Sequence, residues 1–332
     1  MSLQNAPWLW NNNWSLFLPC QNDSNMNTST GETEGFNGTP MALWDIILSV
    51  YYILIFIVAL AGNSLALWTF FHQKHTSSKI FLMNLWIADI CYVLILPVRV
   101  VYHLSYSHWN FGSILCRLSG FLFYLNMYCS LYLMSFISLD RFLAVVLPLR
   151  SQSVRKPLYA KVGVAILWVM VIVSMSPSLF SIKNHSNSTN TCSMLYLEKT
   201  SPQALVSTII AFLIPFITIL ISYVLILLKL RKLKRQEQRP IKAKAVKMIV
   251  LIVMNFLFAF VPYHVCRVVY ILSDIHGHGA TANHESLERA NQITSALTCI
   301  SCILDPVMYF VLNQAYKKTF LQLFCKSTTN SL

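Results

Sequence analysis

The amino-acid sequence predicts an all-α membrane protein in which seven helices cross a lipid bilayer. Of its 332 residues, 56% are hydrophobic and only 11% are charged, whereas a soluble domain carries roughly a quarter charged residues. One helical crossing needs about 20 apolar residues. Seven runs of that kind follow one another along the chain, at residues 42–71, 80–104, 114–147, 159–181, 204–230, 241–273 and 286–312.

These runs divide the chain into three parts. Residues 1–41 form a polar N-terminal tail, residues 42–312 the seven-helix domain, and residues 313–332 a short C-terminal segment. Between Asn313 and Cys325, apolar residues alternate with basic ones, which is typical of a short amphipathic helix lying in the membrane interface. Cys325 ends this stretch, and a cysteine in that position suits S-palmitoylation. The linkers between the runs are too short for a second domain.

The distribution of basic residues predicts the orientation of the chain. With the N-terminus outside, all but six of the 25 Lys and Arg residues fall on the cytoplasmic side, which is the positive-inside pattern. The net charge of +13 therefore requires no nucleic-acid partner. We predict a multi-pass protein of the plasma membrane with an extracellular N-terminus. The tail lacks the features of a cleaved signal peptide, so the first helix is expected to act as the signal anchor.

Glycosylation sequons and cysteines agree with this orientation. Six Asn-X-Ser/Thr sequons fall on the predicted outer side, at Asn13, Asn22, Asn27, Asn37, Asn184 and Asn187. Cys116 and Cys192 lie on the same oxidising side, where disulfides persist, and we expect them to be bridged. Cys20 has no evident partner in the sequence.

Each predicted helix carries a polar, aromatic or proline landmark. In chain order they are Gly62-Asn63-Ser64, Leu85 to Asp89, Ser138 to Phe142, Trp168, Pro215 with Tyr223, Phe260 to His264, and Asp305 to Tyr309. This ordered set resembles the rhodopsin-like G-protein-coupled receptors across the whole membrane domain. The resemblance implies a receptor that binds an extracellular ligand and signals through a heterotrimeric G protein.

The inner end of the third run carries Asp140 and Arg141. An arginine there can pair with its neighbouring carboxylate and release it when a partner protein arrives, or it can simply anchor the helix at the membrane edge. The resemblance implies that Asp140, Arg141, Tyr223 and Tyr309 form the G-protein switch. It also leads us to expect a Gi-type protein. The hydroxyl-rich tail, which includes Ser327, suits a receptor kinase and arrestin.

Two carboxylates, Asp89 and Asp305, are predicted at mid-membrane depth. Two like charges in a medium of low dielectric cannot both remain ionised without help. Either the pair holds a proton or a sodium ion lies among Asp89, Asn126, Ser130 and Asp305. The resemblance implies sodium as an allosteric ion, because in the family the aspartate of the second helix is a sodium ligand.

Cations and aromatic residues are predicted to face each other in the outer half of the bundle. His264 and Arg267 share one face of the sixth helix, and arginine binds phosphate or carboxylate through paired hydrogen bonds. We therefore predict an anionic ligand with an apolar body. Its predicted contacts are Arg99, Tyr102, Tyr124, Tyr128, His264, Arg267 and Arg289. In the alternative, Arg99 and Arg267 pair with Glu288 or Asp274 and only brace the mouth of the bundle.

Four segments resemble the purinergic nucleotide and cysteinyl-leukotriene receptor branch: Phe123 to Tyr128, His264-x-x-Arg267, Lys156 to Tyr159, and Asp305-Pro306. The resemblance implies a nucleotide, a nucleotide sugar or a leukotriene-like lipid as ligand. Gln292 stands where a member of this branch has a basic residue, so a lipid-like anion remains open.

Other function classes fit the sequence less well. The motifs HExxH, GxSxG and GxxxxGK[ST], which would support an enzyme, are missing. Residues 286–312 contain no lysine for a retinal Schiff base, and no symmetry between two halves indicates a transporter. A decoy receptor that binds without strong signalling remains the alternative, because Phe260 replaces the tryptophan usual in the family.

Overall fold

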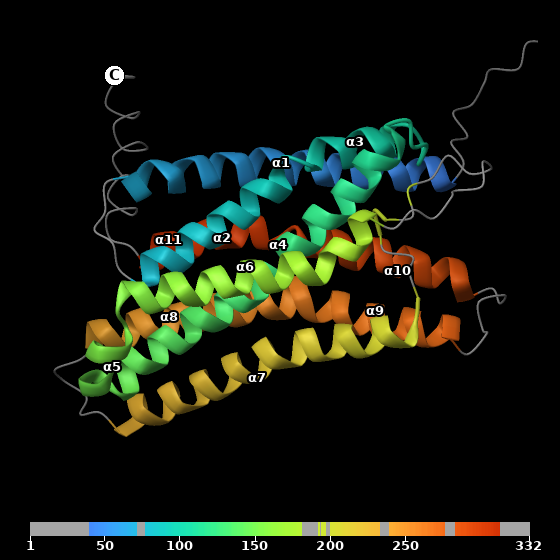
Figure 1. Cartoon of the computed structure of the whole chain (residues 1–332). Helices are drawn as coiled ribbons and strands as arrows, with labels where there is room; N and C mark the ends of the chain where they lie inside the picture. The colour runs from blue at the N-terminus through green and yellow to red at the C-terminus, as the bar shows by residue number, and fades with distance from the viewer. Residues whose placement is uncertain are drawn as a thin grey trace, which may run out of the picture. The chain divides into compact units, whose positions relative to one another are not determined.

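The structure is a computed structural model, shown in Figure 1. It describes residues 40–71, 77–180, 192, 194–196, 200–232, 239–275 and 283–312, all of which belong to the unit Thr39–Leu332. Every regular element in these ranges is a helix. The prediction of an all-α helical bundle is confirmed for the described residues.

The helices follow the predicted apolar runs closely. In chain order they are α1 (Pro40–Phe71), α2 (Ser77–Val93), α3 (Leu96–Leu104), α4 (Gly112–Val146), α5 (Pro148–Val154), α6 (Pro157–Phe180), α7 (Pro202–Lys232), α8 (Arg239–Asn255), η1 (Phe256–Phe260), α9 (Val261–Ile275), α10 (Asn283–Thr298) and α11 (Ser301–Leu312). Helix α4 packs against α2, α6 and α7, while α1 packs against α2, α3 and α11. Helix α9 packs against α7 and α10.

Six spans among the described residues are long and apolar enough to cross a membrane. They correspond to the first six predicted runs, and α2 with α3 forms the second of them, Ser77–Leu104. The seventh run, 286–312, differs because it is divided into α10 and α11. These helices have 16 and 12 residues, so each alone is shorter than one crossing.

The division of the seventh run has a local cause. The backbone N–H of Cys299 donates to the carbonyl of Ala296, three residues earlier, which tightens the turn between the two helices. Further along, Pro306 has no N–H to offer the carbonyl of Cys302. The side chain of Asn63 on α1 donates to that carbonyl instead, at 3.1 Å. A landmark of the first helix thus completes the backbone bonding of the last.

The sixth run contains a π-helical turn. In η1, Phe256–Phe260, the backbone ladder is shifted, and the N–H of Val261 donates to the carbonyl of Phe256, five residues earlier. Pro262 follows immediately, so the irregular turn and the proline coincide. Phe260, which stands where the family usually has tryptophan, is fully buried at this point.

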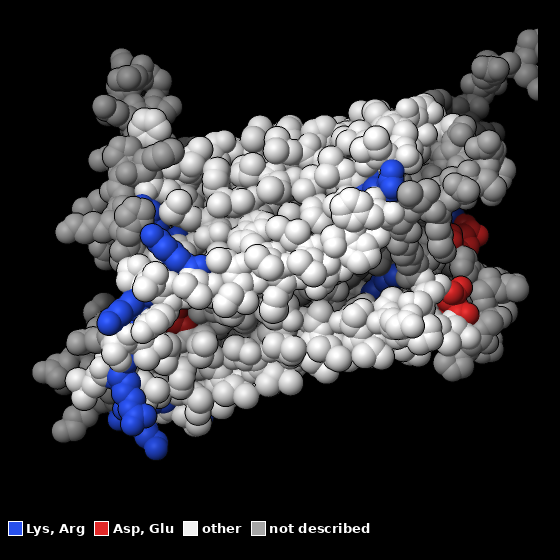
Figure 2. Space-filling view, viewed as in Figure 1, with Lys and Arg blue, Asp and Glu red and all other residues white. Residues whose placement is uncertain are grey.

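Charged residues are separated along the bundle, as Figure 2 shows. On the face shown, most Lys and Arg gather at the end that holds α5 and the C-terminal end of α7, and most of the visible acidic side chains lie toward the opposite end, where a few basic ones are also seen. Between the ends, large apolar side chains are exposed, including Leu94 at 71% and Val173 at 63%. Such a band is unusual on a water-soluble surface and suits contact with lipid hydrocarbon.

Several sequence predictions lie outside the described residues and stay predictions. They concern the six sequons, Cys20, Cys325, Ser327 and the amphipathic stretch 313–325.

Candidate functional site

The outer-loop segment around Cys192 is fastened to α4. A disulfide joins Cys116, near the start of α4, to Cys192, with the two Cα atoms 5.7 Å apart. One turn further along α4 stands Gly120, where an added Cβ would lie 2.6 Å from the carbonyl oxygen of Met194. Only glycine permits that approach, so the chain after the disulfide rests directly on α4.

Arg99 of α3 is fully buried below this segment. Its Nη2 donates to the carbonyl of Leu195 at 2.8 Å, and its Nη1 donates to the Tyr52 hydroxyl at 3.2 Å. The guanidinium carbon also lies 4.8 Å from the ring centroid of Phe123 and 5.2 Å from that of Tyr196, within cation–π range. Arg99 is therefore braced by aromatic rings and a backbone carbonyl.

A buried polar chain continues from this cage to α1. The Tyr52 and Tyr196 hydroxyls are 3.4 Å apart, the Tyr196 hydroxyl contacts His103 Nε2, and His103 Nδ1 lies 2.7 Å from Asp45 Oδ1. Burial raises the pKa of the Tyr196 hydroxyl well above its usual range, so Tyr196 stays protonated and can donate to His103. We name Arg99, Tyr52, Tyr196, His103 and Asp45 the outer polar network.

Of the outer polar network, sequence reasoning singled out Arg99 and missed Tyr52 and Tyr196, together with the two ionisable members Asp45 and His103. A signal was present, because an ionisable residue inside a membrane-length apolar run is a functional candidate by default. It was overlooked because neither residue belongs to a family landmark. Tyr102, a predicted ligand contact, also lies here, with its ring centroid 5.8 Å from that of Trp109.

Four other predicted ligand contacts come together where α4, α7 and α9 meet, namely Tyr124, Tyr128, His264 and Arg267. The Tyr124 hydroxyl lies 3.0 Å from that of Tyr263. The His264 ring stacks on Phe212 at 4.4 Å between centroids and meets Tyr128 edge-on at 6.1 Å. We call the rings of Tyr124, Tyr128, Phe212, Tyr263 and His264 the aromatic wall.

Arg267 and His264 bring nitrogen atoms to the aromatic wall. His264 Nδ1 donates to the Phe260 carbonyl at 2.8 Å, and its Nε2 is buried without a hydrogen-bond partner, which is costly. Arg267 is only 1% exposed and lies within electrostatic range of the Tyr124 and Tyr128 hydroxyls. Its guanidinium carbon is 5.4 Å from the Tyr270 ring. This arrangement can hold an anion.

The seventh predicted contact, Arg289, lies apart from the aromatic wall. Its Nη2 is 2.5 Å from Glu285 Oε1 within α10, and 44% of its side chain is exposed. The neighbouring Gln292 accepts a hydrogen bond from Trp44 Nε1 at 2.7 Å. This part of α10 therefore carries a surface ion pair and the neutral amide of Gln292.

Asp89 and Asp305 are fully buried in α2 and α11. Asn126 donates to Asp89 Oδ1 at 3.1 Å, and Asn255, which the sequence analysis did not single out, donates to Asp305 Oδ1 at 2.8 Å. The second oxygen of each carboxyl group receives no hydrogen bond from an amide or hydroxyl group, the two carboxyl groups interact with each other, and the Ser130 hydroxyl has no hydrogen-bond partner. These oxygens are the ligand type that hard cations prefer.

Asp140 is the centre of a charge cluster at the inner end of α4. Its carboxylate lies 2.5 Å from Arg141 Nη2 and accepts a hydrogen bond from Ser78 at 2.9 Å. Arg155, directly after α5, donates to both carboxylate oxygens, at 2.7 and 3.1 Å. Arg141 therefore faces its neighbouring carboxylate, and Arg155 is a further partner that sequence reasoning missed.

Comparison with known proteins decides the family. Residues 62–309 match the family described as 7 transmembrane receptor (rhodopsin family). The chain belongs to this family. It is 47% identical to the human uracil nucleotide/cysteinyl leukotriene receptor, over 91% of this chain and 82% of that one. It is 46% identical to the mouse protein of the same name, over 87% and 86%, and 31% identical to pig cysteinyl leukotriene receptor 1, over 86% of each.

The family and these relatives are receptors, so the chain is a multi-pass membrane receptor and not an enzyme. The resemblance to the nucleotide and cysteinyl-leukotriene branch is confirmed. The other two residues of the predicted switch lie in the interior of the receptor. Tyr223 accepts a hydrogen bond from Ser138 at 2.7 Å, and the ring centroid of Tyr309 lies 5.4 Å from that of Phe70.

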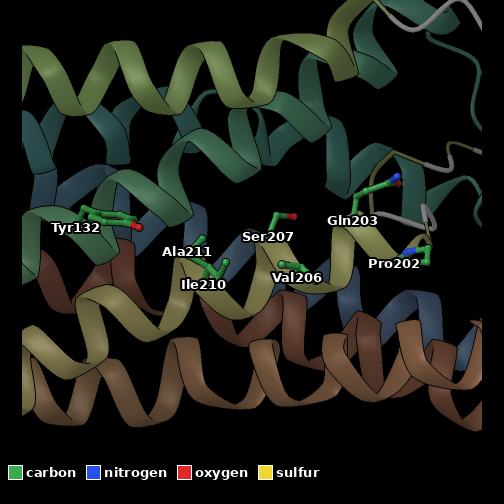
Figure 3. A pocket seen from close by; sticks show the side chains of 7 residues that line it. All are labelled: Tyr132, Pro202, Gln203, Val206, Ser207, Ile210 and Ala211. Carbon is green, nitrogen blue, oxygen red and sulfur yellow. The ribbon is translucent and has the colours of Figure 1, made fainter.

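An open pocket of about 650 Å³ lies between α4 and the outer half of α7 of the receptor, as Figure 3 shows. Tyr132 of α4 lines one side and six residues of α7 the other, among them Gln203, Ser207 and Ile210. None of its lining residues is a predicted ligand contact. The pocket is therefore a groove in the surface of the bundle that is separate from Arg267 and the aromatic wall.

Proposed function

We propose that this receptor binds an extracellular anionic ligand, which is a nucleotide, a nucleotide sugar or a leukotriene-like lipid, and activates a Gi-type heterotrimeric G protein. The observation that supports the proposal is the buried cation Arg267 beside the aromatic wall. The names of the relatives join uracil nucleotides with cysteinyl leukotrienes, and both ligand classes combine an anionic group with a larger apolar or aromatic body.

The chemistry of binding follows from the positions of these groups. The planar guanidinium of Arg267 can form two parallel hydrogen bonds with a phosphate or carboxylate. The hydroxyls of Tyr124 and Tyr128 can donate to the same anion, and His264 Nε2, whose ring proton is on Nδ1, can accept a hydrogen bond from an N–H or O–H of the ligand. The apolar body of the ligand would then pack on the ring of Phe212. Such contacts are strong because the surroundings exclude water.

Arg99 serves a different purpose in this proposal. Its hydrogen bonds to Leu195 and Tyr52, and the four rings around it, already satisfy most of its guanidinium. An anion could reach it only if the outer-loop segment 194–196 moved away. We therefore propose that Arg99 holds this segment over the bundle, and that Arg267 contacts the ligand.

The path to the G protein begins at α9. A ligand that joins Arg267 to α4 acts on α9. This helix begins directly after η1 and contains Pro262, so its backbone hydrogen bonding is already irregular there and a bend is least costly. At the opposite end, Arg141 is held by Asp140 until a partner protein takes its place. We propose that the basic end of the bundle is cytoplasmic and that the N-terminus is extracellular, in the plasma membrane. A receptor kinase and arrestin would act on the C-terminal tail.

A sodium ion between α2 and α11 is part of the proposal. The carboxyl groups of Asp89 and Asp305 interact with each other, the Ser130 hydroxyl has no hydrogen-bond partner, and Asn126 completes the set. An ion there would hold these helices together in the inactive arrangement. The alternative, one proton held by the carboxyl pair, predicts that agonist affinity is indifferent to replacing sodium by N-methylglucamine.

A decoy receptor is the second candidate. It is favoured by Phe260, which is smaller than the tryptophan usual at this position and lacks an indole donor. Helix α9 would then respond weakly to a bound ligand.

The test is a G-protein activation assay in cells expressing the receptor, with surface expression measured in parallel. The panel contains uracil nucleotides, nucleotide sugars, cysteinyl leukotrienes and lysophospholipids. We expect one anion class to activate the wild-type receptor and Arg141→Ala to abolish the response without loss of binding. Binding without activation in the wild type would favour the decoy. Silence and absence of binding across the panel, at normal surface expression, would contradict the anionic ligand.

A further inference from the structure

A small groove opens on the outside of the bundle near its basic end. Its volume is about 190 Å³, and α2, α4 and α6 contribute its walls. Phe81, Phe136 and Leu139 give it apolar sides, and Arg155, Lys156 and Tyr159 stand along its rim. An apolar interior with a basic rim is the pattern of a site for an amphipathic anion. None of these side chains belongs to the ligand site.

Gly163 of α6 lines the same groove. A Cβ added at this position would meet no neighbouring atom within 4 Å, so close packing between helices does not require the glycine. Glycine in a helix interior costs about 1 kcal/mol relative to alanine. The helix therefore leaves open a space that almost any other side chain would begin to fill.

The charges on the rim are basic overall. The groove is lined by one acidic residue, Asp140, whose two oxygens are already bonded by Arg155, Arg141 and Ser78. Lys156 is exposed beside them, with its ammonium group free to reach an anion at the surface. An anionic group in this position would meet two cations and no unsatisfied carboxylate.

We propose that the groove binds an acyl chain of an anionic phospholipid of the cytoplasmic leaflet, with the net negative headgroup, phosphate included, at Lys156 and Arg155. The proposal rests on the orientation given under the proposed function, but not on the identity of the extracellular ligand. The chain lies along Phe136 and Leu139 and over Gly163. A phosphate close to Arg155 competes with Asp140 for its guanidinium, so the lipid also acts on the carboxylate that holds Arg141.

The experiment uses the full-length receptor in lipid nanodiscs. Phosphatidylserine or phosphatidylcholine with a diazirine on one acyl chain is added as a minor component, crosslinked by light, and mapped by peptide mass spectrometry. Two variants disturb the site: Gly163→Leu fills the groove, and Lys156→Gln removes a rim charge. Two matched controls make the same changes outside it, because Ala165 and Lys161 are exposed on the same helix and do not line the groove. They are Ala165→Leu and Lys161→Gln.

We expect crosslinks in residues 136–163 to be several times more frequent with phosphatidylserine than with phosphatidylcholine. Lys156→Gln should lower the phosphatidylserine signal about fivefold, the effect of one cation at an anionic surface. Gly163→Leu should abolish it, and the two controls should change it less than twofold. Equal labelling by both lipids would overturn the recognition of an anionic headgroup. An equal loss of labelling in the two site variants and the two control variants, or no labelling of residues 136–163, would overturn the site itself.

Discussion

Arg99 and Arg267 are both buried arginines in the outer half of the bundle, but their surroundings differ. Arg99 is enclosed by Tyr52, Phe123 and Tyr196 and bonded to the Leu195 carbonyl. Arg267 lies among hydroxyl-bearing rings of the aromatic wall. The sequence predicted both as ligand contacts, because their position along apolar helices cannot reveal which one the outer loop covers.

At this scale we predict that Arg99→Ala mainly destabilises the receptor. The change removes a buried cation and its hydrogen bonds to Tyr52 and Leu195, and a hydrogen bond to a charged group contributes about 1.5–3 kcal/mol. Thermal unfolding of the purified receptor should shift downward, and surface expression should fall. Arg99→Lys should recover only part of the loss, since a lysine cannot make the same forked contacts. A variant with wild-type stability and abolished ligand binding would contradict this role.

A second residue-scale prediction concerns Arg155. It donates two hydrogen bonds to Asp140, and without it Arg141 becomes the only arginine seen on that carboxylate in the described chain. A carboxylate held by fewer cations is easier to protonate, and Asp140 then releases Arg141 more readily. Arg155→Gln should therefore raise ligand-independent G-protein activation. Arg150→Gln is the control, because Arg150 is exposed on α5 and no contact ties it to Asp140. Equal basal activity in both variants would refute the effect.

At the scale of elements, α1 and α11 are joined through a side chain. Asn63 donates to the Ala59 carbonyl of its own helix at 2.9 Å and to the Cys302 carbonyl at 3.1 Å. The second bond replaces the one that Pro306 cannot provide. The seventh crossing therefore depends on a residue of the first, although more than two hundred residues separate them.

We predict that Asn63→Ala destabilises the receptor by about 1–3 kcal/mol, the cost of leaving a buried polar group without a partner. The loss should appear as a lower unfolding temperature of the purified receptor, with or without ligand. Ser64→Ala is the control, because Ser64 is exposed on the same helix. Equal unfolding temperatures for wild type and Asn63→Ala would show that another group, such as a water molecule, satisfies the Cys302 carbonyl.

For the molecule as a whole, the sequence predicted more of the fold than of the site. Apolar runs predict helices reliably here because a membrane-spanning backbone must satisfy its own hydrogen bonds. The break between α10 and α11 was not predicted, since it depends on local backbone bonds around Cys299 that composition does not show. Proline positions alone indicated bends but not the π-helical turn before Pro262.

The sequence likewise predicted only part of the ligand site. Helical spacing placed His264 and Arg267 on one face correctly, because that geometry is local. Apart from Arg99, the outer polar network was missed because Asp45, His103 and Tyr196 come from α1, α3 and the loop that follows α6. The sequence could not show that these residues meet, nor that Arg289 pairs with Glu285 at the surface.

In the proposed receptor, Arg267 holds the anionic group of the ligand. The most direct measurement is the affinity of the activating anion for purified wild-type receptor, Arg267→Ala and Arg289→Ala. Arg289 is the matched control, because it is an arginine of the same end whose side chain is exposed and ion-paired. We expect Arg267→Ala to lose roughly 2–4 kcal/mol of binding free energy, as for one partner of a buried charge contact, and Arg289→Ala to lose less than about 1 kcal/mol. Equal losses in the two variants, or a larger loss in Arg289→Ala, would contradict the claim.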